Sequence, residues 1–219
     1  MGTQYAFGQI VTDGLVLCLN ASDRNSYVSG STTWNDVSGR GNNGTLTNGP
    51  TFNSGNGGSI VFDGVNDYTS FSNPGTNGTI QLNFYWRGQG QKLVMGDYSG
   101  GNAMLYVGSG GLGNLGRYLI WFPSSIDFGF GYEIQPTTAQ WINVVLSWEG
   151  TGNNKMYFNG TLVQNAVCAI TKPNIWYVAG NTYSPHNINV SSILTYNRVL
   201  TASEVQQNYN AQKSRFGII

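Results

Sequence analysis

The sequence predicts an all-β fold, an antiparallel β-sandwich jelly roll that ends in one short C-terminal helix. Short runs of apolar, β-branched and aromatic residues recur at roughly 8–14-residue intervals, as in antiparallel sandwiches. Gly, Asn, Ser and Pro separate these runs, and the 31 glycines are spread along the chain, which indicates many tight turns and not disorder. Strong helix signals occur only in the last stretch.

The expected strands are short, and each is bounded by turn residues. Residues 141–148 form the strongest strand, because six of the eight are apolar and five of those are β-branched or aromatic. Residues 78–86 alternate apolar and polar side chains, which predicts a half-buried strand. Asn159-Gly160 is a preferred two-residue hairpin turn. The other expected strands are 14–19, 45–47, 51–52, 57–64, 68–71, 92–95, 104–107, 118–122, 128–132, 155–158, 161–163, 175–179 and 188–196.

The closing helix has the clearest start in the sequence. Thr201 and Glu204 have the spacing of a capping box, in which each side chain binds the backbone N–H of the other residue. Leu200 and Val205 are placed to form a hydrophobic staple around that box. Gly217 is suited to end the helix. Glu204 therefore reads as a helix cap and not as an acid catalyst.

Length and charge limit the possible classes of protein. At 219 residues one domain is the default, with an N-terminal arm at residues 1–13 and a single jelly-roll domain at residues 14–219. Charged residues make up 9% of the chain, against a usual ~25%, and the net charge is zero. This balance argues against nucleic acid or an anionic membrane as a partner. The sequence has no secretory signal pattern and no apolar run of membrane-spanning length.

The two cysteines lie in apolar runs. Buried free thiols are the simpler interpretation of Cys18 and Cys168, because cysteine is often a small core residue. A disulfide between them stays open, since terminal strands of a sandwich can be neighbours.

Several segments together resemble one known family. They begin with Gly14-Leu-Val-Leu and Trp34-Asn-Asp-Val-Ser-Gly-Arg-Gly-Asn-Asn-Gly, and continue with Gly58-Ser-Ile-Val-Phe-Asp-Gly and Trp141-Ile-Asn-Val-Val. The last is Ile193-Leu-Thr-Tyr-Asn-Arg-Val-Leu-Thr-Ala-Ser-Glu-Val. In order and spacing they resemble the laminin-G-like branch of the concanavalin A-like lectin/glucanase superfamily, over nearly the whole chain. This resemblance implies a jelly roll, frequent carbohydrate binding at loops or at the concave face, and calcium in some members.

A narrower resemblance concerns the two ends of the domain. The start at Asp13-Gly14-Leu-Val-Leu and the end at Asn208-Tyr-Asn-Ala-Gln-Lys-Ser-Arg-Phe-Gly look like domains in virion structural proteins of tailed bacteriophages. Such domains occur in fibres, tail adhesins and capsid decorations. The resemblance implies a location at the virion surface, outside the cell after lysis.

The residues give little support to an enzyme. Retaining glucanases of this superfamily place paired carboxylates on one strand in a Glu-x-Asp-x-x-Glu pattern. This chain has three glutamates, Glu133, Glu149 and Glu204, and none has that spacing. The single histidine, His186, has no nearby cysteine, so no metal-ligand spacing is present. We therefore expect no catalytic residues, no metal site and no required cofactor.

Glycan binding has better candidates, in three loops at residues 34–36, 96–102 and 180–187. The loops combine aromatic faces with Asn and Asp side chains, which suit sugar rings and their hydroxyls. We favour a core role for Trp34, and Trp141, Trp148, Tyr157 and Phe158 also read as core. Asp97 with Asn102 could hold a calcium through oxygen ligands. The candidate carbohydrate-binding residues are Asp97, Tyr98, Asn102, Asn181, Tyr183 and His186.

The combined prediction is a non-enzymatic virion structural protein, either a surface decoration or a tail- or fibre-associated subunit, with glycan adhesion as a further role. Its expected partners are other capsid or tail proteins, further copies of itself and glycans. The alternatives are a carbohydrate-binding module or adhesin of a bacterial cell surface and, with less support, a glycoside hydrolase.

Overall fold

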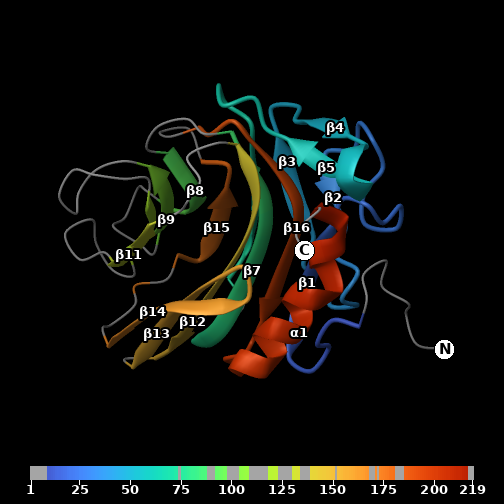
Figure 1. Ribbon diagram of the computed structural model, residues 1–219. Helices are drawn as coiled ribbons and strands as arrows, with labels where there is room; N and C mark the ends of the chain where they lie inside the picture. Colours follow the sequence, from blue (N-terminus) through green and yellow to red (C-terminus); the bar gives the residue numbers. More distant parts are fainter. Residues whose placement is uncertain are drawn as a thin grey trace.

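The fold is described by a computed structural model (Figure 1). It describes residues 9–73, 75–87, 92–97, 104–108, 118–122, 130–133, 139–150, 152–167, 171, 173–180 and 185–216. In 92–93, 104, 107–108, 118–122 and 130–133 only the backbone is described.

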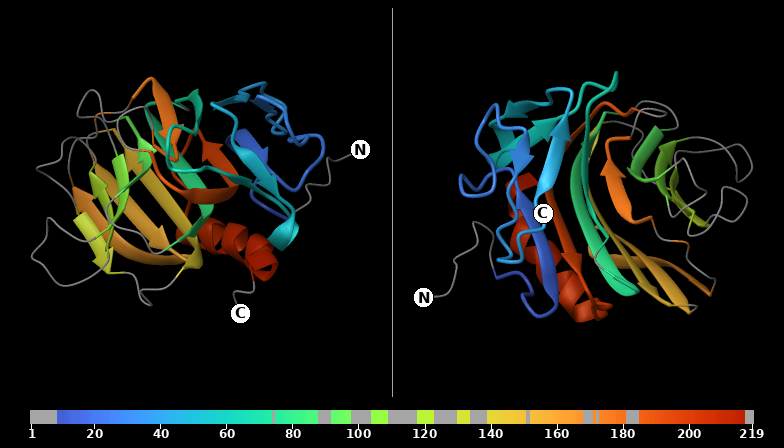
Figure 2. Two further views of the ribbon diagram at one scale, coloured as in Figure 1. Left: turned by 90° about the horizontal axis from the view of Figure 1, so that it is seen from above. Right: turned by 180° about the vertical axis from the view of Figure 1, so that it is seen from behind.

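Two antiparallel sheets form a sandwich, as the sequence predicts (Figures 1 and 2). The first, sheet A, has the order β14-β13-β12-β7-β16-β5-β4, and β1 also pairs with β16. Its strands are β1 (Leu15–Asn20), β4 (Thr51–Asn53), β5 (Ser59–Val61), β7 (Asn77–Trp86), β12 (Gln140–Glu149), β13 (Asn153–Phe158), β14 (Thr161–Val167) and β16 (Ile188–Tyr196).

The second, sheet B, has the order β11-β10-β9-β8-β15-β6-β3-β2. Its strands are β2 (Thr33–Trp34), β3 (Gly44–Thr47), β6 (Tyr68–Ser72), β8 (Lys92–Gly96), β9 (Met104–Gly108), β10 (Tyr118–Phe122), β11 (Phe130–Glu133) and β15 (Ile175–Val178). A 3-10 turn, η1 (Gly55–Gly57), precedes β5. After β16 come the helix α1 (Ala202–Lys213) and a second 3-10 turn, η3 (Ser214–Phe216).

The facing sides of the sheets enclose the main core. Trp34, Trp148 and Trp176 are all completely or almost completely buried there, and the rings of Trp148 and Trp176 lie 6.0 Å apart across the sandwich. The predicted core roles of Trp34 and Trp148 are thus confirmed. Trp141 is instead half-buried and stacks on Phe216 at 4.5 Å.

The predicted hairpin turn is present. Asn159 and Gly160 have φ values of 48° and 80°, the left-handed conformation that a two-residue turn between paired strands requires. Tyr157 pairs with Leu162 and Phe158 with Thr161 on either side of the turn.

The expectation that residues 78–86 form a half-buried strand is wrong. Almost every residue of β7 is buried, including its polar positions Gln81 and Asn83. The apolar side faces the sandwich core, and the helix α1 lies along the other side of sheet A (Figures 1 and 2). The alternation of apolar and polar residues along β7 correctly predicts one apolar and one polar side. The polar side chains, however, are covered by the helix α1 and not by water.

A buried polar layer joins α1 to sheet A. Asn83 is at its centre: its side-chain amide donates to Ser192 and Gln212, and its oxygen accepts from Asn143 at 2.8 Å. Asn208 on α1 donates to the hydroxyl of Tyr196 at 2.9 Å and to Gln81 at 3.1 Å. Because buried polar groups are costly without partners, these bonds fix the position of the helix on the sheet.

Part of the predicted N-terminal arm lies beneath the same helix. Ile10 and Val11 are buried in a second apolar cluster with Leu194 and Val205. The backbone N–H of Val11 donates to Asn208 at 2.8 Å, and its carbonyl accepts from Tyr196 at 3.0 Å. The last residues of the arm are therefore packed against the domain, and residues 1–8 lie outside the described part.

Cys18 is a free thiol buried in that second cluster. Burial, with Asp36 and Asp23 as weaker causes, raises the pKa of Cys18 far above its usual range, so the thiol is not reactive. Cys168 lies outside the described residues.

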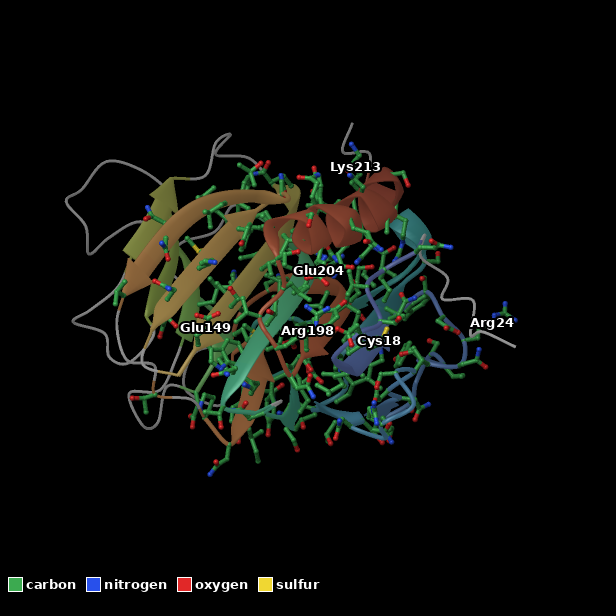
Figure 3. All side chains as sticks on the ribbon, turned by 90° about the horizontal axis from the view of Figure 1, so that it is seen from below. Cys18, Arg24, Glu149, Arg198, Glu204 and Lys213 are labelled. Carbon is green, nitrogen blue, oxygen red and sulfur yellow. The ribbon has the colours of Figure 1, made fainter. Side chains whose placement is uncertain are left out.

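The predicted capping box of α1 is confirmed. The Thr201 hydroxyl accepts from the Glu204 N–H at 3.3 Å, and the Glu204 carboxylate accepts from the Thr201 N–H at 2.8 Å. The sequence did not reveal a further contact, in which the Arg198 guanidinium binds both oxygens of Glu204, at 2.6 and 3.0 Å (Figure 3). This pairing lowers the pKa of Glu204 to about 2. Gly217 lies outside the described residues.

Replacing Glu204 by alanine is expected to lower the free energy of unfolding by about 0.5–2 kcal/mol, because the cap and the ion pair are lost together. Glu204→Gln should lose less at neutral pH, since the amide oxygen can still accept from the Thr201 N–H. Because the pKa of Glu204 is lowered in the folded state, its ionised carboxylate adds to the free energy of unfolding. This contribution is complete above pH 4.5 and is lost as the pH falls towards about 2. Chemical unfolding of both variants across this pH range measures it. A changed ligand affinity with unchanged stability would contradict the capping role.

Candidate functional site

The structure describes two of the six predicted carbohydrate-binding residues. Tyr98, Asn102, Asn181 and Tyr183 lie outside the described residues, so their role stays a prediction. Asp97 and His186 are described, and they differ in exposure. Asp97 follows the end of β8 and is half-buried, whereas the His186 side chain is only 1% exposed.

The strand register separates the two predicted loops. The His186 N–H donates to the Ala179 carbonyl at 2.9 Å, and the Ala179 N–H donates to the Val94 carbonyl at 2.9 Å. His186 is thus linked through Ala179 to Val94, the central residue of β8, while Asp97 follows the last residue of that strand. The structure does not bring these two residues together, and Asp97 is the one with access to solvent.

The loop at residues 34–36 has a structural role. Trp34 is fully buried, as expected. Asp36 binds the backbone N–H groups of Cys18, Ser38 and Asn42 at 2.8–3.0 Å. The carboxylate is therefore committed to holding this loop against β1.

Near the end of β8, which Asp97 follows, the outer face of sheet B carries a half-buried aromatic pair. Tyr68 on β6 and Tyr177 on β15 are both half-buried, and their rings meet edge to face at 5.7 Å. Their neighbours along each strand, such as Thr69 and Trp176, point inward and are buried. Tyr177 pairs in register with Gly96, the residue before Asp97. We call this surface the tyrosine face; it comprises Thr45, Thr47, Tyr68, Ser70, Ser72, Ile175 and Tyr177.

The strand register arranges hydroxyls in a row on the tyrosine face. Thr45 pairs with Ser70, and Ser70 pairs with Tyr177, so the three side chains lie side by side on neighbouring strands. Strand spacing separates each from the next by roughly 4.8 Å. The hydroxyls of Thr45 and Ser70 form no hydrogen bond within the described part of the chain, so both can bind a ligand.

The chemistry of the tyrosine face suits a neutral, hydroxylated ligand. None of its seven residues carries a charge at neutral pH. Tyrosine offers a flat apolar ring and a polar hydroxyl together, so one side chain can stack on a ring and form a hydrogen bond. Threonine and serine hydroxyls both donate and accept, as pairing with ligand hydroxyls requires.

The sequence contained a signal for this face. In Tyr68-Thr-Ser-Phe-Ser72 the side chains Tyr68, Ser70 and Ser72 share one side of the strand, and Phe71 faces the other. The partner Tyr177 could not be assigned to the same surface, because the pairing of β6 with β15 joins distant parts of the chain.

The two glutamates whose side chains the structure describes, Glu149 and Glu204, do not line one pocket. Glu149 lines an open pocket of about 610 Å³ together with Arg198. Glu204 does not line it, and with a pKa of about 2 its carboxylate stays ionised and cannot serve as a general acid. Among the described residues, no group of three or more His, Cys, Asp or Glu side chains could hold a metal ion.

Comparison with known proteins identifies the fold. The sequence matches no known family model and no curated protein sequence. Solved structures that are similar include receptor-binding domains of botulinum neurotoxins. They include the C/D mosaic serotype (TM-score 0.69, 12% identity), type C, whose cell entry depends upon interaction with two ganglioside molecules (0.70, 10%), and neurotoxin DC in complex with SialylT (0.68, 12%).

The three similarities cover most of this chain but only about half of each neurotoxin domain. In each case the match covers 92% of this chain and 52% of the other, so this chain spans about half the length of those domains. At such low identity the likeness establishes the β-sandwich fold.

The described part of the chain contains no helix with the length and apolar character that a membrane-spanning segment needs.

Proposed function

We propose that this protein is a non-catalytic, lectin-like domain that binds neutral glycans on the tyrosine face. The observation that carries the proposal is the half-buried Tyr68–Tyr177 pair on the outer side of sheet B, flanked by the Thr45 and Ser70 hydroxyls, which have no hydrogen-bond partner among the described residues. A sugar ring has an apolar face for such aromatic rings and hydroxyls for the Thr45–Ser70 row. Asp97, at the edge of this surface, would accept hydrogen bonds from the same ligand.

The comparisons add support at the level of the fold. A neurotoxin binding domain in complex with SialylT, and one from neurotoxin type C, whose cell entry depends upon interaction with two ganglioside molecules, have a sandwich similar to this one. Because this chain spans about half of those domains, their ligands support a carbohydrate as the ligand class, and the preference for a neutral glycan is argued from the uncharged tyrosine face alone.

Replacing Tyr177 by alanine is expected to weaken glycan binding at least about tenfold, equivalent to about 1.4 kcal/mol. Tyr177 lies between Tyr68, whose ring it contacts, and the hydroxyls of Ser70 and Thr45. Its removal would therefore take away the ring on which the sugar would stack beside those hydroxyls. A glycan array with the wild-type protein would supply the ligand, and titration calorimetry would measure its affinity for each variant. Thermal melting should change little, since the ring is partly exposed.

Tyr85→Ala is the matched control, because Tyr85 is also half-buried and in ring contact, with Trp141, but lies on sheet A. Asp97→Ala tests the edge of the site separately. Equal effects of Tyr177→Ala and Tyr85→Ala, or no binding to any glycan on the array, would contradict the proposal.

We also propose that the domain acts in a virion, as a decoration or tail-associated structural protein that contacts other virion proteins and further copies of itself. Support comes from the phage-like segments at Asp13-Gly14-Leu-Val-Leu and after Asn208, and from the zero net charge. A bacterial surface adhesin is the alternative setting. Density for this fold in intact particles would support the proposal, and its absence from purified particles would contradict it.

The non-catalytic part of the proposal has its own test. The protein would be incubated with a panel of polysaccharides, and released reducing ends would be measured. We expect no release above that of a heat-denatured sample, and release that depends on Glu149 would contradict this.

A further inference from the structure

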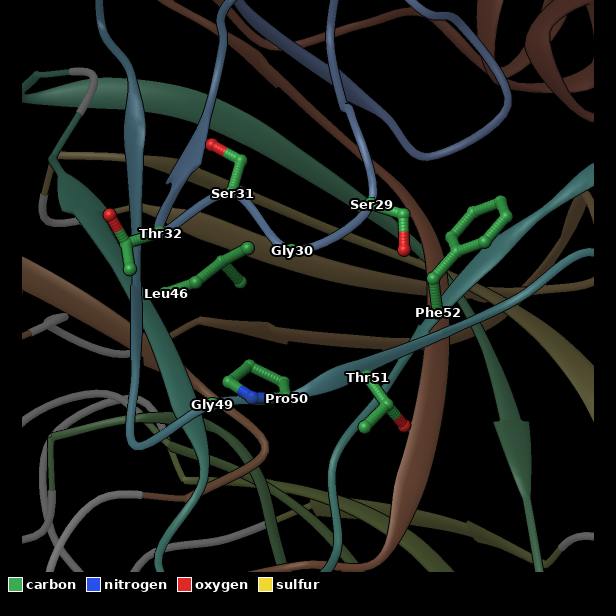
Figure 4. A pocket seen from close by; sticks show the side chains of 9 residues that line it. All are labelled: Ser29, Gly30, Ser31, Thr32, Leu46, Gly49, Pro50, Thr51 and Phe52. Atoms are coloured by element: carbon green, nitrogen blue, oxygen red, sulfur yellow. The ribbon is translucent and has the colours of Figure 1, made fainter.

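A second surface feature lies apart from the tyrosine face. An open pocket of about 380 Å³ lies between residues 29–32 and residues 49–52, where the chain passes from β3 in sheet B to β4 in sheet A (Figure 4). Leu46 forms part of its lining and points to the opposite side of β3 from Thr45 and Thr47. The pocket and the tyrosine face are therefore separate surfaces.

The walls of this pocket are held in place by the fold. The ring of Phe52 lies 5.7 Å from the buried ring of Tyr27. The Tyr27 hydroxyl accepts from the Gly30 N–H at 3.2 Å, and the Leu46 N–H donates to the Thr32 carbonyl at 2.8 Å. A ligand would thus meet a largely preformed site, which reduces the entropy lost on binding.

The lining combines an apolar wall with available hydroxyls. Leu46, Pro50 and Phe52 provide the apolar surface, and Phe52 is 37% exposed. Around them, three hydroxyls form no hydrogen bond to any described residue. They belong to Ser29, Thr32 and Thr51.

This lining limits the class of ligand. None of the lining residues carries a charge, so an ionic ligand would lose its hydration without gaining a counter-charge. A wholly apolar ligand would displace water from the exposed Ser29 hydroxyl without replacing its hydrogen bonds, which is also unfavourable. A ligand with one apolar face and a hydroxylated edge satisfies both parts of the wall. The pocket volume is near the lower limit for ligand sites, which fits a single ring.

We infer that this pocket is a second, independent binding site that holds one neutral sugar ring, stacked on Phe52 and hydrogen-bonded by Ser29, whose hydroxyl points into the pocket (Figure 4). The inference shares its ligand class with the proposed function but none of its residues. With two sites on one domain, the protein would engage a branched or multivalent glycan at two points and gain affinity through effective concentration.

The test is a two-dimensional NMR titration of the full ¹⁵N-labelled chain with glucose, galactose, mannose and N-acetylglucosamine, each added separately. At least one sugar should shift the amide signals of residues 29–32 and 49–52. Ser29→Ala removes the hydroxyl that points into the pocket, and Phe52→Ala removes the stacking wall. Each should weaken binding at these signals at least about fivefold. Tyr177→Ala should leave their titration unchanged.

The outcomes separate the two proposals. No shift in the pocket signals with any of the sugars, or an unchanged affinity in Ser29→Ala, overturns the inference and leaves the tyrosine face untouched. Loss of the pocket shifts in Tyr177→Ala would also overturn it, because the sites would not be independent. Pocket shifts without any shift around Tyr68 and Tyr177 would support the inference and contradict the proposed function. If Phe52→Ala fails to fold, Ser29→Ala decides.

Discussion

Replacing Trp148 by alanine is expected to lower the free energy of unfolding by about 3–5 kcal/mol, one of the two largest effects we predict. Trp148 is completely buried, and its ring packs against Trp176 of the other sheet at 6.0 Å. It also fills the space above Gly78 on β7, where an added Cβ would lie 2.7 Å from the ring. Removing the indole therefore opens a cavity between the sheets that rigid strands cannot close.

Urea unfolding followed by circular dichroism would measure this loss, with the slope against denaturant confirming a two-state transition. Trp148→Phe is the matched control: it retains a ring, and the indole N–H that it removes has no partner among the described residues, so the loss should be much smaller. Gly78→Ala alone should cost about 1–3 kcal/mol by overpacking. Combined with Trp148→Ala it should cost less than the sum, since the new methyl enters the cavity. Strict additivity would contradict the packing described.

The strands and the helix cap could be predicted because their signals are local. Turn residues mark strand ends, Asn159-Gly160 specifies its hairpin, and Thr201 with Glu204 specifies the helix start. The two-residue strand Thr33–Trp34 was not predicted, since it is too short to show an alternation of apolar and polar residues. Its membership of sheet B depends on pairing with β3.

The candidate site could be predicted far less well, because it depends on which strands become neighbours. Sequence reasoning placed the site in loops, and among the described loop residues His186 is buried while Asp97 is half-buried. The tyrosine face arises only when β6 and β15 pair, which brings Tyr68 and Tyr177 together. The pocket at Phe52 likewise needs the loop at residues 29–32 to lie against β3 and β4.

The burial of the polar residues on β7 also could not be predicted from the sequence. Alternation at residues 78–86 separates an apolar from a polar side, but it does not say what covers the polar side. The helix α1 covers that polar side. Its buried residues follow helical spacing and include two amides; they are Val205, Asn208, Tyr209 and Gln212. Those amides match Gln81 and Asn83 on the sheet, so sheet and helix are complementary in hydrogen bonding and not in apolar surface alone.

Replacing Asn208 by alanine is the second large effect, with an expected loss of about 2–4 kcal/mol, because several buried partners lose a hydrogen bond at once. Its oxygen accepts from the Val11 N–H at 2.8 Å, and its amide donates to Gln81 and to the Tyr196 hydroxyl. The side chain thus joins the N-terminal segment, the helix and the sheet. Asn210→Ala is the matched control, since Asn210 lies on the same helix but is exposed, and it should change stability little.

Hydrogen exchange would locate the effect of Asn208→Ala. The Val11 amide, which loses its acceptor, should exchange at least about tenfold faster than in the wild type, while amides of β6 and β15 on sheet B keep their relative protection. Ligand binding at the tyrosine face should be retained, because that surface lies on the other sheet. If Asn208→Ala destabilised the protein no more than Asn210→Ala, the polar layer would not be what holds α1 and residues 10–11 on the sandwich.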